Sequence, residues 1–181
     1  RSPNVSICEE QYESHLNDVG EIIDPDAPID WSKKPLTFEV TSPGNIVWKA
    51  QNTAYTTTIE YKKNDGEWTS IRSATGNTAP SISVVSGDVV QFRGDNATYS
   101  SGNSRCNYFS GTTCGFNVKG NIMSLINSTD FATETTLTSA HTFYYLFYSC
   151  TGLTDASNLI LPATTLAPYC YQNMFQSCTS L

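Results

Sequence analysis

The C-terminal part of the chain repeats itself with a fixed period, and this feature constrains the fold more than any other. The blocks 143–153 and 171–181 match, with one constant offset, at apolar and cysteine positions, namely the pairs Leu146/Met174, Phe147/Phe175, Cys150/Cys178 and Leu153/Leu181. A fixed period of roughly 20 to 50 residues is typical of a solenoid, in which each repeat is one supersecondary unit that stacks on the next. The repeat therefore predicts a stacked architecture at this end of the chain.

Each repeat is expected to contain a short helix and a short strand. In the stretches 146–150 and 174–178 the matching residues lie at positions i, i+1 and i+4, which favours a helix with one face inward. The apolar run 159–161 stops at Pro162, which has no N–H to continue a ladder, so this run predicts a strand. The shared register of the two cysteines, Cys150 and Cys178, indicates buried, reduced core positions, because free cysteine packs as a small hydrophobic residue.

The middle of the chain, from residue 35 to about residue 119, alternates between apolar and polar residues, as in the run 36–41. Such alternation places one face of a strand in a core and the other in water. Two turn sequences, Asn64-Asp65-Gly66 and Ser86-Gly87-Asp88, each separate two such runs and predict hairpins. About seven short strands fit an immunoglobulin-like β-sandwich. Trp48 and Trp68 are expected to pack in its core or at its edge rather than to form a sugar platform.

These patterns divide the chain into three segments, 1–34, 35–119 and 120–181. The first carries eight acidic residues against three basic ones, and it is interpreted as an acidic lead-in or linker with one short helix over 6–17. The second is the predicted β-sandwich domain. The third is the repeat segment, which we expect to continue beyond residue 181, because a solenoid generally needs three or more repeats and a capping unit.

The composition argues against several classes of protein. The net charge is −7 and no basic stripe is present, so nucleic-acid binding is disfavoured. The sequence has no apolar run long enough for a transmembrane helix. It has no Cys-x-x-Cys pair and only two histidines, His15 and His141, which gives no pattern for zinc. No nucleophile is paired with a base in a recognisable motif, so we expect no enzymatic activity and no cofactor.

Three cysteines, Cys8, Cys106 and Cys114, precede the repeat segment. Cys106 and Cys114 flank a short loop and are the candidates for a disulfide in an oxidising compartment, with two free thiols as the alternative. Cys8 is disfavoured as the acylated cysteine of a lipoprotein, because the bulky Ile7 precedes it and because an acylated cysteine would be the first residue of a mature chain.

The repeat segment is rich in aromatic residues. At helical spacing Phe143 and Phe147 point inward, whereas Tyr144 and Tyr148 form a second stripe that is expected to be at least partly exposed. Exposed tyrosines provide a large contact area at a low cost in entropy. The alternative is lateral packing against the neighbouring repeat. The candidate ligand-binding residues are Tyr144, Tyr148 and Tyr171.

Several stretches of the sequence carry a resemblance to a known family. In the repeat segment they are Leu161-Pro162-Ala163-Thr164-Thr165-Leu166-Ala167, Cys170-Tyr171, Met174-Phe175 and Cys178-Thr179-Ser180-Leu181. Upstream they are the runs 65–71, 86–94 and 118–125. Together they resemble the BspA-like leucine-rich-repeat surface proteins of gut Bacteroidales and the β domain that precedes such repeats.

This resemblance implies an exported cell-surface protein, anchored to the outer membrane or secreted, whose repeats display a binding face. It implies adhesion to a protein or glycan ligand, and it supplies no catalytic residue. The sequence leaves a second function open as an alternative. The chain is alternatively an accessory surface lipoprotein of an outer-membrane complex that takes up glycan or peptide nutrients.

Overall fold

The computed structural model describes residue 24 and residues 26–181. The chain divides into two compact units, Arg1–Asp30 and Trp31–Leu181. The helix expected over 6–17 lies outside the described residues. The second unit is mainly β, as the alternating sequence predicts. Its helices are short 3-10 helices, namely η1 (Trp31–Lys33), η2 (Gly76–Thr78), η3 (Ile122–Leu125) and η4 (Phe131–Thr133).

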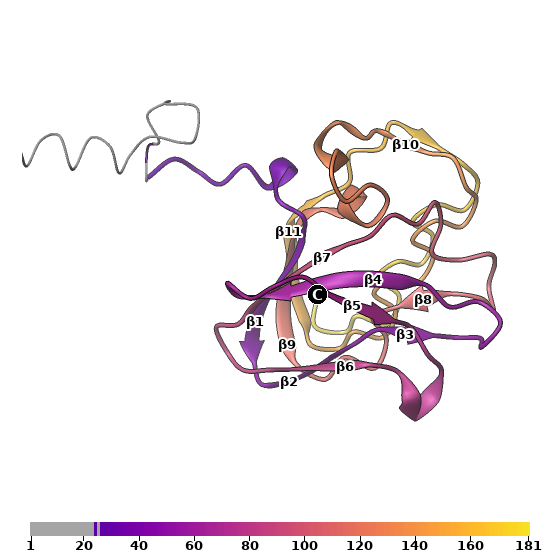
Figure 1. The fold of residues 1–181 in the computed structure, drawn as a ribbon, viewed down its shortest axis with the longest axis horizontal. Coiled ribbons are helices and arrows are strands. Elements are labelled where there is room, and N and C mark those ends of the chain that lie inside the picture. The colour runs from indigo at the N-terminus through magenta and orange to yellow at the C-terminus, as the bar shows by residue number, and fades with distance from the viewer. Residues whose placement is uncertain (1–23, 25) are drawn as a thin grey trace, which may run out of the picture. The chain divides into compact units, whose positions relative to one another are not determined.

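The largest sheet has six strands (Figure 1). In their order across the sheet they are β11 (Leu153–Ile160), β9 (Gly115–Asn121), β1 (Leu36–Ser42), β7 (Val89–Arg93), β4 (Thr58–Lys63) and β5 (Thr69–Arg72). β1 is antiparallel to both of its neighbours, whereas β11 pairs with β9 in parallel. The sheet therefore joins a strand of the repeat segment to strands that precede it, and the boundary expected at residue 120 falls inside β9.

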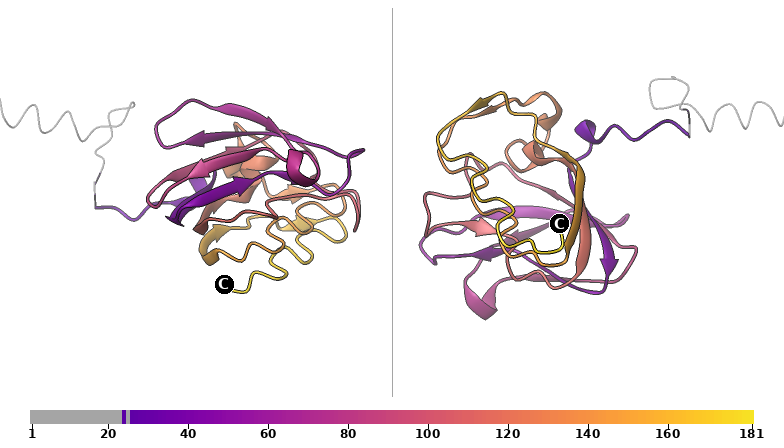
Figure 2. Two further views of the ribbon diagram at one scale, coloured as in Figure 1. Left: turned by 90° about the horizontal axis from the view of Figure 1, so that it is seen from below. Right: turned by 180° about the vertical axis from the view of Figure 1, so that it is seen from behind.

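The remaining strands form two-stranded sheets. The pairs are β2 (Gly44–Val47) with β6 (Ser81–Val84), β3 (Lys49–Ala50) with β8 (Asn107–Tyr108), and β10 (Thr136–Leu137) with β12 (Thr165–Leu166). The first two pairs are antiparallel and the third is parallel. Figure 2 shows that the C-terminal residues, in yellow, wind as a run of turns without a helical coil.

One of the two predicted hairpins forms and the other does not. β4 and β5 pair around Asn64-Asp65-Gly66, and Asn64 adopts a φ of 51°. The strands that flank Ser86-Gly87-Asp88 belong to different sheets, because β6 pairs with β2 while β7 pairs with β1 and β4. The Asp88 carboxylate accepts the Val85 N–H at 2.9 Å, and the Gly87 N–H donates to the Val40 carbonyl of β1 at 2.9 Å. This turn thus carries the chain from one sheet to another.

The predicted repeat helices are not helices. Residues 141–152 and 169–180, here called the first and second turn segments, form successive turns. Positive φ recurs along both, at His141, Phe143, Tyr145 and Ser149 in the first and at Tyr169, Tyr171, Asn173 and Ser177 in the second. Each turn closes over three residues, as in the bond from the Tyr148 N–H to the Tyr145 carbonyl at 2.8 Å. Spacing of i, i+1 and i+4 arises in such turns as well as in a helix, and it therefore misled the prediction.

Hydrogen bonds between the two turn segments hold this unusual backbone. Positive φ is costly for bulky residues and persists only where the surroundings enforce it. N–H groups of the first segment donate to carbonyl groups of the second at 3.2, 2.9 and 2.9 Å, in the pairs Tyr145/Gln172, Phe147/Met174 and Ser149/Gln176. The donors recur at every second residue, so the bonds form a regular ladder.

Side chains at equivalent positions of the two repeats stack on one another. The two stacks are Phe109–Phe147–Phe175 and Tyr99–Phe143–Tyr171. Ring centroids are 5.9 and 5.4 Å apart in the first stack and 5.7 and 5.8 Å apart in the second, with nearly parallel planes. The first ring of each stack comes from the chain before residue 120. One hydrophobic core therefore runs from the sheet through both turn segments.

Candidate ligand-binding surface

A row of aromatic rings follows the first turn segment and continues onto its neighbours. Its members, here called the aromatic row, are Tyr108, Tyr148, Tyr145, Tyr144, His141 and Tyr169. Successive ring centroids are 6.4, 4.9, 4.2, 5.9 and 4.7 Å apart. The last pair is stacked, with an interplanar angle of 20°. Three parts of the chain, β8 and the two turn segments, thus contribute to one continuous aromatic contact.

The members of the row differ in exposure. Tyr169 is 58% exposed, and most of the others are half-buried. Tyr144 is only 4% exposed, so its expected partial exposure is not found. The reason is the backbone: in a series of turns, unlike in a helix, residues 144 and 148 do not share one outer face. The surface available to a ligand is therefore formed by Tyr169 and by the half-buried members of the row, which are Tyr108, His141, Tyr145 and Tyr148.

Neighbouring side chains change the acidity of the central tyrosine. Interaction with the Tyr144 side chain, together with desolvation, raises the pKa of Tyr145. Asn173 of the second turn segment lowers this pKa in part. Burial also raises the pKa of Tyr108. Both phenols are therefore neutral at physiological pH, since removing their protons is disfavoured.

The structure brings together two of the three predicted ligand-binding residues. Tyr144 and Tyr148 both contact Tyr145 in the aromatic row. Tyr171 instead belongs to the inner stack on Phe143. Burial raises the pKa of Tyr171 to about 12, and its hydroxyl has no hydrogen-bond partner among the described residues. Tyr171 is thus a core residue with one ring face toward the open side of the stack.

Sequence reasoning missed four members of the row, which are Tyr108, His141, Tyr145 and Tyr169. For one pair a signal was present, because Tyr169 follows His141 by one full repeat and therefore occupies the equivalent place. Tyr145 was missed because a helix would have turned it away from Tyr144. Tyr108 lies outside the repeat, and nothing in its spacing marks it.

The cysteines proposed to form a disulfide are free thiols among the described residues, so that bond is not formed in this structure. The Cys106 thiol donates to the Gly102 carbonyl at 3.4 Å and lies 3.3 Å from the Ser100 hydroxyl. Burial raises the pKa of Cys106, and it raises that of Cys114 to about 11. Protonated thiols are weak nucleophiles and weak metal ligands. Within the described part of the chain, no group of three or more His, Cys, Asp or Glu is placed to hold a metal ion.

The two tryptophans considered as sugar platforms are engaged within the protein. Trp48 is 1% exposed, and its indole N–H donates to the Thr57 carbonyl at 3.2 Å, which confirms core packing. Trp68 is half-buried, and the Arg93 guanidinium lies 4.1 Å from its ring centroid. That contact covers one face of the ring, so Trp68 is not a free platform.

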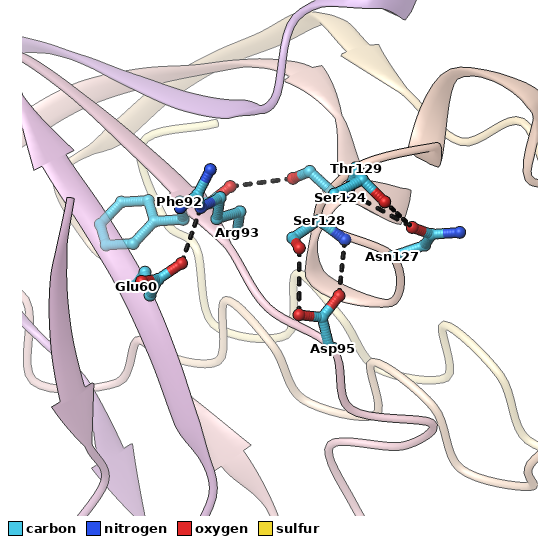
Figure 3. A network of polar contacts seen from close by, with 8 residues as sticks. All are labelled: Glu60, Phe92, Arg93, Asp95, Ser124, Asn127, Ser128 and Thr129. Atoms are coloured by element: carbon cyan, nitrogen blue, oxygen red, sulfur yellow. Dashed lines mark hydrogen bonds and ion pairs between the residues drawn. The ribbon is translucent and has the colours of Figure 1, made fainter.

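A network of polar contacts ties the turn 127–130 to strand β7 (Figure 3). The Asp95 carboxylate accepts the N–H and the hydroxyl of Ser128 at 2.8 and 3.0 Å. The Ser124 hydroxyl donates to the Phe92 carbonyl at 2.9 Å, and Arg93 pairs with Glu60 at 2.7 Å. The Asp95 carboxylate is thus engaged in holding the turn at Ser128.

Comparison with known proteins gives no match: no family model, no curated protein and no solved structure matches this chain. Among the residues that the structure describes, no helix has the length and apolar character needed to cross a membrane. The interpretation of the aromatic row therefore depends on its geometry.

Proposed function

We propose that this chain is a non-enzymatic interaction protein of the cell surface, and that the aromatic row binds a protein or glycan ligand in adhesion. The single observation that carries the proposal is the row itself, with five consecutive ring contacts and neutral hydroxyls at a partly exposed surface. Tyrosine combines a large apolar face with a polar end, which suits it to recognition. The rings are held by the turn segments, so binding costs little conformational entropy.

The architecture that we propose around this surface is a β-sandwich followed by the first units of a BspA-like leucine-rich-repeat solenoid. Support comes from the stacking of equivalent side chains in the two repeats, and from the ladder between the turn segments. In this architecture the strands before residue 120 cap one end of the solenoid, because Tyr99 and Phe109 supply the first ring of each stack.

The charge around most of the row narrows the ligand chemistry. Residues 126–181, which supply every member except Tyr108, contain three acidic residues and no Lys or Arg. Among the described strand partners of the row, a basic side chain occurs at the Tyr108 end alone, where Lys49 is the β-strand partner of Tyr108. Ring faces and neutral hydroxyls favour contact with neutral sugars or with apolar and aromatic peptide side chains.

Binding to a panel of host glycoproteins and glycans tests the proposal. The double variant Tyr145→Ala/Tyr169→Ala is expected to bind about tenfold or more weakly, since buried tyrosines at interfaces contribute more than about 1 kcal/mol each. The matched control is Val85→Ala, because Val85 has the same exposed fraction as Tyr169, 58%, but lies on the turn between β6 and β7. Unchanged binding by the double variant, or no binding by the unaltered chain to any member of the panel, would contradict the proposal.

A further inference from the structure

A cavity of about 360 Å³ lies beside strands β2 and β3, away from the repeat segment. Along residues 45–50 the even-numbered positions are only 1% exposed, because they point into the core. The odd-numbered ones, Asn45, Val47 and Lys49, therefore share the outer face, and all three line the cavity. Its volume falls within the range of about 300–1,000 Å³ that is typical of small-molecule sites.

Main-chain contacts hold the two sides of the cavity. On one side, the Thr113 N–H donates to the Asn45 carbonyl at 2.9 Å, and the Thr113 hydroxyl accepts the Asn45 N–H at 3.0 Å. On the other side, Ser81 of β6 is the strand partner of Val47, and η2 contributes Asn77. The side-chain amides of Asn45 and Asn77 and the hydroxyl of Ser81 form no hydrogen bond within the described part of the chain, so they are available to a ligand.

Lys49 differs from the other half-buried basic residues in having no partner among the described residues. The four others each contact a carboxylate or a tryptophan ring, namely Lys62, Lys63, Arg93 and Lys119. No Asp or Glu lines the cavity. Partial removal of an ammonium group from water is unfavourable unless an opposite charge compensates it. A ligand with a negative charge would supply that compensation at Lys49.

The cavity adjoins the first ring of the aromatic row. Lys49 of β3 is the antiparallel strand partner of Tyr108 of β8. Side chains of such partners lie on the same face of the pair, with Cβ atoms about 4.5–5.5 Å apart. A ligand bound in the cavity therefore reaches Tyr108, and from there the row continues to Tyr148.

We propose that the cavity binds a hexuronic acid unit of an acidic glycan, with the sugar carboxylate paired to the Lys49 ammonium group. The amides of Asn45 and Asn77 both donate and accept hydrogen bonds, as the hydroxyls of a sugar do, and Val47 contacts the C–H face of the ring. An acidic peptide would supply the carboxylate but few hydroxyls for these amides. The adjacent sugar units then lie on the aromatic row, a step that rests on the proposed function.

NMR titration of the whole chain with sodium glucuronate, and with glucose as the matched neutral sugar, tests the proposal. Glucuronate should shift the amide signals of residues 45–49, 77 and 111–113 in a saturable way, about tenfold more tightly than glucose, and added salt should weaken it. Lys49→Met keeps the length of the side chain without its charge, so it should remove the preference for glucuronate. Equal binding of the two sugars, no shift with glucuronate, or an unchanged preference in Lys49→Met would overturn the proposal.

Three controls separate this site from other events. Lys62→Met removes a half-buried base that does not line the cavity, so this variant should bind glucuronate as the unaltered chain does. Glutamate with both ends blocked carries the carboxylate on a peptide unit, and tighter binding of it than of glucuronate would overturn the proposal in favour of an acidic peptide. The variant Tyr145→Ala/Tyr169→Ala should bind the single sugar unchanged, so failure of the cavity and failure of the aromatic row are distinguishable. Loss of glucuronate binding in either variant would also overturn the proposal.

Discussion

The two turn segments share a period, a backbone and several side chains, yet they differ in burial. Phe147 and Cys150 of the first, and Leu153 directly after it, are fully buried. The equivalent residues one repeat later are less covered: Phe175 and Cys178 of the second segment are half-buried, and Leu181 directly after it is 52% exposed. The first segment lies between the rings of Tyr99 and Phe109 and those of the second segment, whereas the second is covered on one side. Equivalent residues of the two repeats therefore contribute differently to stability, because the segments that pack on them differ.

The two segments also differ at one backbone position. Gly152 of the first corresponds to Ser180 of the second, one repeat later. A Cβ atom at Gly152 would lie 2.1 Å from the Cys114 carbonyl oxygen, a distance at which atoms clash. Ser180 is exposed and has room for its side chain. Glycine is therefore required at position 152, because the backbone just before β9 lies against this turn.

Truncation of the stacked phenylalanines should give the largest difference between the segments. Phe147→Ala removes the middle ring of a stack, and it should lower the free energy of unfolding by about 3–5 kcal/mol. Phe175→Ala removes an outer, half-buried ring and should cost about 1–2 kcal/mol. Urea denaturation of both variants measures the two values. Equal losses would show that the second segment is covered as fully as the first.

Substitution of the glycine should give the next largest effect. Gly152→Ala forces the start of β9 away from the turn, and it should destabilise the protein by about 1–3 kcal/mol. The matched variant Ser180→Ala should stay within about 0.5 kcal/mol of the unaltered chain. Thermal and denaturant unfolding measure both. A neutral Gly152→Ala variant would mean that β9 and the turn are not in close contact.

Thiol reactivity should report the same asymmetry. The Cys150 thiol donates to the Phe109 carbonyl at 3.4 Å, and the Cys178 thiol donates to the Phe147 carbonyl at 3.0 Å. Burial raises the pKa of both, but Cys178 is only half-buried. Alkylation followed by mass spectrometry should modify Cys178 about tenfold faster than Cys150 in the native protein. Faster modification of Cys150 would contradict the proposed order of burial.

Acid should lower the free energy of unfolding through a carboxylate of the sheet region and not through the turn segments. This is the smallest of the four expected effects. Hydrogen bonds from Lys63 and Asn64 lower the pKa of Asp88 from 3.8 to about 2. Because the folded-state pKa is the lower one, this contribution to stability is present above about pH 4 and is lost as the pH falls through about 2. The turn segments contain no Asp or Glu. Urea midpoints at about pH 5 and pH 2.5 should differ less in Asp88→Asn than in the unaltered chain, and an equal difference would contradict this.

The sheet was largely predictable from the sequence because its strands have one buried face. Leu36, Phe38 and Val40 are at most 4% exposed, as their alternation with polar residues indicates, although the intervening Thr37 is buried as well. The hairpin at Asn64-Asp65-Gly66 was predictable for a similar reason, since Asn and Gly tolerate positive φ. The failed hairpin shows the limit, because turn residues do not reveal which strand each neighbour will pair with.

The turn segments were not predictable in the same way. Positive φ is usually marked by Gly or Asn, but here Phe143, Tyr145 and Tyr169 adopt it, and bulky aromatic residues give no such signal. Hydrogen bonds from a segment one full repeat away enforce the conformation, and a local pattern does not contain them. The aromatic row depends on this backbone, which is why the sequence pointed to the region but selected Tyr144 and Tyr171 over Tyr145 and Tyr169.

The parallel pairing of β11 with β9 has a mechanical consequence. β11 begins directly after the first turn segment, and its partner β9 lies beside β1 in the sheet. Tension applied along β11 shears this pair lengthwise, so that its hydrogen bonds carry the load together instead of opening one after another.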